Sequence, residues 1–91
     1  MEITHEPEHR RYVLSDDGEF LGEVEYDQSG HTLDLVRAEV PPDKRGQGLG
    51  VPLVKGTLEA IRKMGGLTIR PTCPYIAKYM MKNPEFDDLK A

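Results

Sequence analysis

The sequence contains a single cysteine and no long hydrophobic run, and both deficits limit what the protein can be. One cysteine excludes an internal disulfide bond and a metal cluster built from several cysteines. No apolar run approaches the roughly 20 residues that a membrane-spanning helix needs. The N-terminal residues Met1–Glu6 also lack the basic and apolar regions of a signal peptide. We therefore expect a protein of a reducing, cytoplasmic compartment, with no membrane partner and no metal ion.

A surplus of basic residues is absent too. The chain has 16 acidic and 12 basic side chains, which gives a formal net charge of −4. A general nucleic-acid-binding protein usually carries a basic surplus, so nucleic acid is not an expected partner. An anionic small ligand is still compatible with this charge, because Lys44 and Arg45 form a local positive patch.

The length of 91 residues fits one domain with a modest core. A domain of this size buries only about 60–65% of the surface that its unfolded chain exposes. Residues 1–9 are polar and show little periodicity, so we expect them to be loosely ordered, with at most a short strand near Ile3. The prediction is a single domain over residues 1–91 that is a monomer or a weak homodimer.

Three strands are predicted in the first half of the chain, over Arg10–Leu14, Phe20–Tyr26 and Thr32–Val40. The first two are joined by an Asp-Gly turn, which is a strong hairpin signal, and the next two by the polar turn 27–30.

The alternation of side chains assigns faces to these strands. In the second strand one face is formed by Phe20, Gly22, Val24 and Tyr26. In the third strand Leu33 and Leu35 occupy one face, and the opposite face is formed by Val36, Ala38 and Val40. Apolar residues on both faces predict a central strand that is covered on both sides.

A helix is predicted to begin near Gly50, because Pro52 is tolerated only in a first turn. Its apolar stripe consists of Val51, Val54, Leu58 and Ile61, and Gly65-Gly66 ends it. A short strand over Leu67–Arg70 and a second helix over Pro74–Lys82 follow, with Phe86 and Leu89 as the last core contacts. The order β-β-β-α-β-α predicts an α/β protein of the mixed α+β kind. An antiparallel three-stranded meander is followed by a right-handed crossover to a parallel fourth strand.

The stretch from Val40 to Gly50 lies between the third strand and the first helix and contains two prolines, two basic residues and three alternate glycines. Free N–H groups at a helix start favour a phosphate. A Walker-type loop is excluded, because no glycine here precedes Lys and then Ser or Thr. A dinucleotide fingerprint starting at Gly46 would need a small residue where Val51 stands. The remaining pattern, [Q/R]-x-x-G-x-[G/A], is filled by Arg45, Gly48 and Gly50.

This pattern resembles the pyrophosphate loop of the GCN5-related N-acetyltransferases (GNAT). The resemblance covers about Arg10 to Leu89 and includes the order of the elements. The downstream segments Cys73-Pro74-Tyr75 and Asn83-Pro84-Glu85-Phe86 resemble those of the minimal single-domain subgroup of that superfamily. The other interpretation of the glycine stretch is an ordinary strand-to-helix turn.

The resemblance implies that acetyl-CoA is the cofactor. It places the pyrophosphate on the amides of Gly46 to Val51, the pantetheine arm on the strand end near Glu39 and Val40, and the cofactor thiol near Cys73. The candidate cofactor-binding residues are Glu39, Val40, Arg45, Gly46, Gln47, Gly48, Leu49, Gly50, Val51, Cys73 and Tyr75.

Three residues are candidates for catalysis. Cys73 stands at a predicted helix start, which lowers a thiol pKa. The alternatives are an acyl acceptor, a base, a neighbour of the cofactor thiol or a small buried core residue. The resemblance implies that Tyr79 is a general acid, and packing on the sheet is the other interpretation. Glu39 is a candidate base acting through water, although strand carboxylates are more often simply solvated.

The sequence departs from the subgroup at one position, since Arg37-Ala38 stands where members often have His-Thr. A histidine base is therefore not available there. The leading prediction is an acetyl-CoA-dependent N-acetyltransferase that acts on an amine of a small molecule or a protein side chain. The alternatives are an acyl-CoA-binding module without significant turnover, and a structural domain in which the glycine stretch is only a turn.

Overall fold

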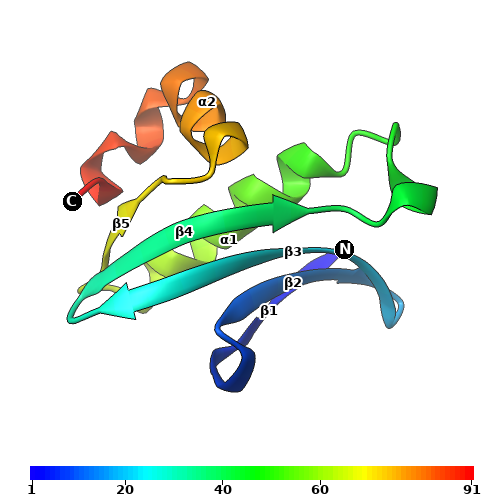
Figure 1. The fold of residues 1–91 in the computed structure, drawn as a ribbon, viewed down its shortest axis with the longest axis horizontal. Helices are drawn as coiled ribbons and strands as arrows, with labels where there is room; N and C mark the ends of the chain where they lie inside the picture. Colours follow the sequence, from blue (N-terminus) through cyan, green and yellow to red (C-terminus); the bar gives the residue numbers. More distant parts are fainter.

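The computed structural model describes all 91 residues as one mixed sheet with two α-helices (Figure 1). The strands are β1 (Glu2–Glu6), β2 (Arg11–Asp16), β3 (Glu19–Ser29), β4 (Thr32–Glu39) and β5 (Thr68–Arg70). The helices are α1 (Gly50–Met64) and α2 (Pro74–Lys82), with 3-10 segments η1 (Pro7–His9), η2 (Pro42–Lys44) and η3 (Pro84–Leu89). The sheet order is β1-β2-β3-β4-β5, and only β4 and β5 are parallel. The predicted element order is confirmed from β2 onward, as is the parallel pairing of the strands on either side of α1, and β1 adds a fourth strand to the predicted three-stranded meander.

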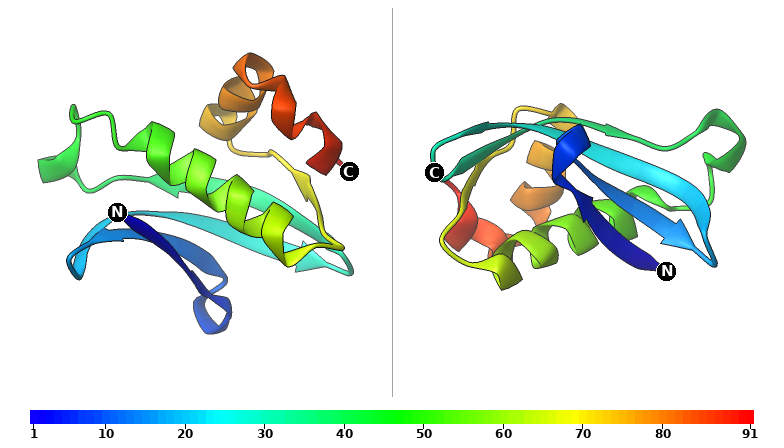
Figure 2. Two further views of the ribbon diagram at one scale, coloured as in Figure 1. Left: turned by 180° about the vertical axis from the view of Figure 1, so that it is seen from behind. Right: turned by 90° about the horizontal axis from the view of Figure 1, so that it is seen from below.

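The molecule has two layers. The curled sheet forms one layer, and α1, α2 and η3 lie together on one of its faces, so that the other face is not covered by a helix (Figure 2, right). A core of 18 buried residues fills the space between the layers. No helix is both long and apolar enough to span a membrane.

The polar N-terminal segment is ordered, and the expectation of a loose start is wrong. β1 pairs with β2 along its whole length, from Glu2 opposite Ser15 to Glu6 opposite Arg11. Two side chains of β1 that point toward the core hold the strand in place. Ile3 packs on α1 at Gly56, and His5 stacks on Tyr12 with ring centroids 4.3 Å apart. The expected short strand near Ile3 is therefore part of a full edge strand.

A bulge in β3 corrects the predicted faces of that strand. Leu14 pairs with Gly22 and Ser15 with Phe20, so Leu21 is an extra residue. Such an insertion interrupts the alternation of faces. Phe20 therefore does not share the core face of Val24. It is partly exposed, and the Arg11 guanidinium lies 5.8 Å from its ring centroid.

A second bulge corrects the prediction for β4. Glu25 pairs with Arg37 and Tyr26 with Leu35, so Val36 is the extra residue. Ala38 and Val40 consequently pack against the same core as Leu33 and Leu35. The prediction that this strand is covered on both sides is wrong, because the bulge turns Ala38 and Val40 toward the helices and leaves Val36 exposed.

Helix α1 begins at Gly50, as predicted, but its buried stripe differs at the first turn. The buried residues are Leu53, Val54, Thr57, Leu58 and Ile61, whereas Val51 is 51% exposed. At about 100° per residue, Val51 lies at the margin of the arc that these residues define. Leu53 takes the place in the core that was predicted for Val51.

Candidate active site

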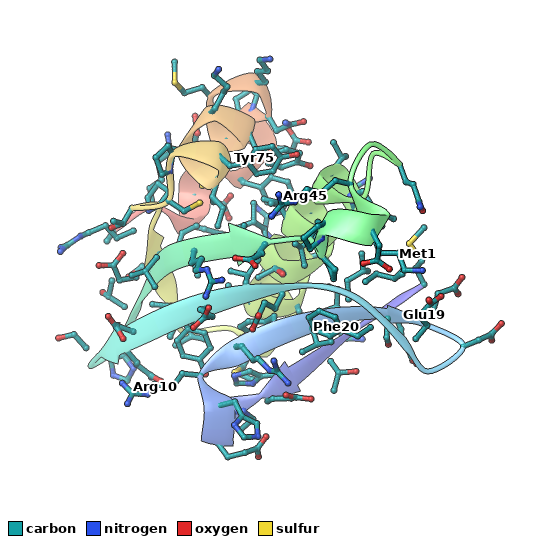
Figure 3. All side chains as sticks on the ribbon, turned by 45° about the vertical axis from the view of Figure 1, so that its right-hand side comes forward. Met1, Arg10, Glu19, Phe20, Arg45 and Tyr75 are labelled. Carbon is teal, nitrogen blue, oxygen red and sulfur yellow. The ribbon has the colours of Figure 1, made fainter.

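A cavity of about 520 Å³ lies where the C-terminal end of β4, the glycine-rich loop and the first turn of α1 meet. Tyr75, from the first turn of α2, forms the opposite wall. Figure 3 shows Arg45 and Tyr75 at the same end of the molecule, between the loop and α2. The lining residues are Ala38, Glu39, Val40, Lys44, Arg45, Gly46, Gly48, Leu49, Gly50, Leu53 and Tyr75.

The cavity exists because β4 and β5 separate. They pair only from Thr32 opposite Thr68 to Asp34 opposite Arg70. The N–H of Cys73 then donates to the carbonyl of Leu35 over 2.9 Å. Beyond that point β4 runs away from β5 and α2 (Figure 1), and its second half pairs with β3 alone. The backbone groups along this edge are free to bond an extended ligand.

The loop presents free donors beside this edge. The N–H groups of residues 46–51 donate no hydrogen bond to another backbone group of the protein. Gly46 has φ +87° and Gly48 has φ +71°, conformations that a residue with a side chain rarely adopts. The unpaired amides at the start of α1, together with the helix dipole, make this loop a suitable place for a phosphate group.

Two basic side chains lie in the same wall. Lys44 donates to Glu19 over 2.6 Å, and this bond raises the pKa of Lys44. Arg45 donates from Nε to the carbonyl of Val40 over 3.0 Å and forms no ion pair. Its remaining N–H groups are therefore available to an anion in the cavity.

Tyr75 approaches the helix start so closely that a side chain at residue 50 would displace its ring. A Cβ atom on Gly50 would lie 2.3 Å from the Tyr75 hydroxyl oxygen. The tyrosine is 46% exposed, so its ring forms a wall of the cavity without being locked in the core. The glycine at position 50 thus serves close packing across the cavity as well as access to the backbone amides.

The structure brings together most of the residues that the sequence singled out for cofactor binding. Gln47, Val51 and Cys73 do not line the cavity. Three lining residues, Ala38, Lys44 and Leu53, were missed. Lys44 had been noted only for its charge, and no pattern in the sequence predicts that Leu53 reaches the cavity floor.

Cys73 is buried and belongs to the core cluster. It is the N-terminal cap residue of α2, as predicted, but its side chain makes no capping hydrogen bond. Its N–H is bonded to Leu35 at the point where β4 and β5 separate. The thiol therefore lies in the protein interior, next to the point where β4 and β5 separate.

Tyr79 lies between α2 and η3, with its ring centroid 6.3 Å from that of Phe86. Burial, and then the charges of Glu85 and Glu59, raise the pKa of Tyr79. Its phenol therefore stays protonated through the neutral range, as a proton donor must. It does not line the cavity.

Glu39 lines the cavity, but its carboxylate belongs to an ion pair on the uncovered face of the sheet. The partner is Arg37, which also donates to Glu25 over 2.6 Å. The hydrogen bond to Glu39 and the nearby charge of Glu25 raise the pKa of Arg37. The residue that stands in the place of the missing histidine thus holds the carboxylate of the candidate base.

A mixed sheet that opens at one end beside free amides defines a small α+β protein whose cavity is bordered by unpaired backbone groups. The sequence model of the family described as GCN5-related N-acetyl-transferase matches residues 11–89. The chain therefore belongs to the GCN5-related N-acetyltransferase family, and the resemblance inferred from its motifs is confirmed.

One solved structure supports the fold independently. It is a solution structure from Staphylococcus aureus described as a GCN5-like putative N-acetyltransferase. Its TM-score with this chain is 0.70 at 22% sequence identity, and the match covers 99% of this chain and 87% of the other. At this identity the likeness concerns the fold alone. No curated protein sequence matches the chain significantly.

Proposed function

We infer that the protein is an acetyl-CoA-dependent N-acetyltransferase that moves an acetyl group to an amine. The observation that carries this inference is the cavity between the free edge of β4 and the start of α1, which combines unpaired strand groups with unpaired helix amides. An extended thiol ester with a pyrophosphate group needs both kinds of partner. Family membership supports the same reaction.

The residues present fit acetyl-CoA. The amides from Gly46 to Val51 would bond the pyrophosphate, and Arg45 would add a charge-assisted bond. The edge of β4 at Glu39 and Val40 would hold the pantetheine arm, and Tyr75 would close the cavity over it. Acetyl-CoA supplies the activated acetyl group, and a backbone N–H on the β4 edge would stabilise the negative charge that develops on the acetyl oxygen.

Proton transfer would fall to side chains of α2 and β4. The Tyr79 phenol is a candidate proton donor to the departing thiolate, as the resemblance to the family implies, and it is protonated at neutral pH. Glu39 is a candidate base that takes the proton of the amine through water. Cys73 keeps the alternatives of a covalent acceptor, a base, a neighbour of the thiol and a small buried core residue, and its burial outside the cavity lining supports the last of these.

Calorimetric titration of the protein with acetyl-CoA tests the proposal. We expect one binding site with a dissociation constant on the order of micromolar, within the usual range of Michaelis constants. Arg45→Ala should weaken binding of acetyl-CoA but not of pantetheine, which lacks the pyrophosphate. The matched control is Arg70→Ala, because Arg70 is exposed and lies away from the cavity. Absence of binding would reject the proposed function.

The alternative, an acyl-CoA-binding module without significant turnover, is favoured by the ion pair that occupies Glu39. Turnover with a panel of amines separates the two functions. Tyr79→Phe should lower kcat with little effect on affinity for acetyl-CoA if Tyr79 is the acid. Mass spectrometry after mixing with acetyl-CoA would detect an acetyl group attached to Cys73. Full acetyl transfer to an amine by the Cys73→Ala protein would exclude a covalent role for Cys73.

A further inference from the structure

One side of the cavity is backed by a glycine of the neighbouring strand. Gly22 lies near the start of β3, beside the end of β4, because the two strands run antiparallel (Figure 1). Glu23 pairs with Glu39, so Gly22 stands opposite Val40 when this register is continued by one residue. Gly22 is buried and does not itself line the cavity. It therefore lies behind the strand end on which the proposed function places the pantetheine arm.

A Cβ atom on Gly22 would meet three neighbours at once. It would lie 3.0 Å from the carbonyl oxygen of Glu39, 3.2 Å from Cδ2 of Leu53 and 3.4 Å from Cγ2 of Val40. The first two distances are tighter than ordinary contacts of a Cβ atom. All three neighbours line the cavity. A side chain at position 22 would therefore displace the cavity lining, which we call the floor and define as Glu39, Val40 and Leu53.

The bulge in β3 explains why a residue without a side chain is needed here. Leu21 is the extra residue of the bulge, and Leu21 and Gly22 are both buried, although consecutive side chains of a strand normally point to opposite faces. Bulges are frequent next to active sites, where they redirect a side chain. A glycine inside a strand often marks a place where another backbone approaches closely. Here the approaching backbone is that of Glu39.

Leu53 has little room to move except into the cavity. It is 1% exposed and belongs to the core cluster, which fills the space between the sheet and the helices. A closely packed core does not absorb an extra methyl group without shifts of its side chains. The cavity is the empty space that adjoins Leu53, so the displaced atoms would enter it. Glycine within a strand also lowers stability relative to alanine, so this position gives up stability for room.

We propose that Gly22 is a positioning residue that sets the depth of the cavity, and thereby how tightly the cavity holds the uncharged arm of its ligand. Gly22 acts through the floor and does not touch the ligand. The three atoms nearest to its missing side chain belong to the floor, and none belongs to the loop from Gly46 to Val51. The phosphate end of the cavity should therefore not depend on Gly22. That the arm is pantetheine rests on the proposed function.

Titrations followed by heteronuclear NMR test the proposal with two fragments of the cofactor. Pantetheine has the uncharged arm without phosphate, and ADP has the pyrophosphate without the arm. Gly22→Ala should weaken binding of pantetheine and of acetyl-CoA by roughly three- to tenfold, because part of the strain of overpacking is transferred to the ligand. Its affinity for ADP should equal that of the parent protein. Unchanged binding of pantetheine, or equal weakening of ADP and pantetheine, would overturn the proposal.

Gly56→Ala is the matched control for strain elsewhere in the core. Its Cβ atom would lie 2.5 Å from Cγ1 of Ile3, and neither residue lines the cavity. We expect a lower melting temperature and an unchanged affinity for all three ligands. If Gly56→Ala weakens pantetheine binding as much as Gly22→Ala does, a general loss of packing is the cause and the position of the floor is not.

A compensating change on α1 tests whether Gly22 acts through Leu53. Leu53→Val shortens the side chain that faces Gly22 and should weaken pantetheine binding by roughly twofold through lost contacts. The double variant Gly22→Ala with Leu53→Val should bind pantetheine better than either single variant, because the added methyl group fills the space that the shorter side chain leaves. This comparison with Leu53→Val also decides the matter if Gly22→Ala alone does not fold. A double variant that binds more weakly than Leu53→Val contradicts the proposal.

Two results separate this proposal from the proposed function. If acetyl-CoA binds the parent protein and Gly22→Ala equally well, the function stands and the positioning role is rejected. If the parent protein binds neither acetyl-CoA nor pantetheine, the proposed function fails, and NMR without ligand decides the claim about the floor. Gly22→Ala should then shift the methyl signals of Leu53 and the amide signal of Val40, and Leu53→Val should reduce the shift at Val40. Unshifted signals would overturn it.

Discussion

The two halves of β4 show how one strand serves two purposes. The first half is paired on both sides, with β3 and with β5. The second half, beyond the bulge at Val36, is paired with β3 only and borders the cavity. We refer to β1–β3 with the first half of β4 and β5 as the paired region, and to the second half of β4, the glycine-rich loop and the first turn of α1 as the open region.

The difference lies in where the backbone hydrogen bonds go. In the paired region the strands satisfy one another, and the core is sealed by side chains such as Leu35 and Ile69, which have no exposed surface. In the open region the donors and acceptors of the strand edge and of the helix start are left without backbone partners. An unpaired edge invites pairing with other chains. Here Pro41 and Pro42 end the strand, and the Arg45 side chain donates a hydrogen bond to the carbonyl oxygen of Val40.

The comparison predicts that damage to the paired region affects stability before function. Ile69→Ala removes a fully buried side chain from β5, and the lost burial and the cavity left behind should cost about 2–5 kcal/mol. Urea unfolding measures this loss. Acetyl-CoA affinity of the protein that remains folded should be unchanged, because Ile69 does not line the cavity. A proportionate loss of affinity would show that the two regions are not separable.

The sequence predicted the open region better than the paired one, and the reason is local. Pro52 sets the start of α1, and glycines mark the loop, because both residue types restrict or release the backbone where they stand. The bulges at Leu21 and Val36 depend on the register of the neighbouring strand. A fixed alternation read along one strand therefore cannot reveal them.

The candidate site was predictable where it follows the chain and not where it depends on tertiary contact. The loop residues and Tyr75 come together as the family motif implies. The contact of Tyr75 with Gly50, and the part of Leu53 in the cavity floor, depend on how α2 packs against α1. The ion pair of Glu39 with Arg37 likewise follows from the twist and register of the sheet.

Within the paired region one defect should limit stability at high pH. The Tyr12 hydroxyl is buried and has no hydrogen-bond partner. Burial raises the pKa of Tyr12 from 10.0 to about 12. A raised folded-state pKa adds stability that is complete below about pH 10 and is lost as the pH rises toward about 12, amounting to about 2–3 kcal/mol.

Tyr12→Phe should remove most of this alkaline loss and should be at least as stable as the parent protein at pH 8, because no bond is broken. Chemical unfolding at pH 8, 10 and 11 measures both effects. Tyr26→Phe is the control, since the Tyr26 hydroxyl bonds Nε2 of His5 over 2.6 Å and its loss should destabilise the fold at pH 8. A Tyr12→Phe protein that loses stability as steeply as the parent above pH 10 would contradict the assignment.

Adding a methyl group at Gly50 should affect the open region, whereas adding one at Gly56 should affect the paired region. Gly50→Ala brings a Cβ atom 2.3 Å from the Tyr75 hydroxyl oxygen in the open region. The exposed ring can turn away, at a cost of about 0.5–1.5 kcal/mol for a strained side chain. Acetyl-CoA affinity should fall by roughly two- to tenfold with little change in melting temperature.

Gly56→Ala is the matched variant, because its Cβ atom would lie 2.5 Å from Cγ1 of Ile3 in the paired region. It should lower the melting temperature and leave the affinity unchanged. A double-mutant cycle of Gly50→Ala with Tyr75→Ala checks the cause. If Gly50→Ala still lowers affinity when Tyr75 is absent, the contact between the two residues is not the reason.

The smallest effect is expected from Arg37→Gln, at the boundary between the two regions. Arg37 follows the bulge and bonds Glu25 across the strand pair and Glu39 along its own strand. These bonds are exposed, so their loss should lower the melting temperature only slightly, and less in high salt. Arg37→Lys should keep most of the effect of the charge but not both bonds at once. If Arg37→Gln melts far below the parent even at high salt, side chains rather than backbone pairing hold the open half of β4 in place.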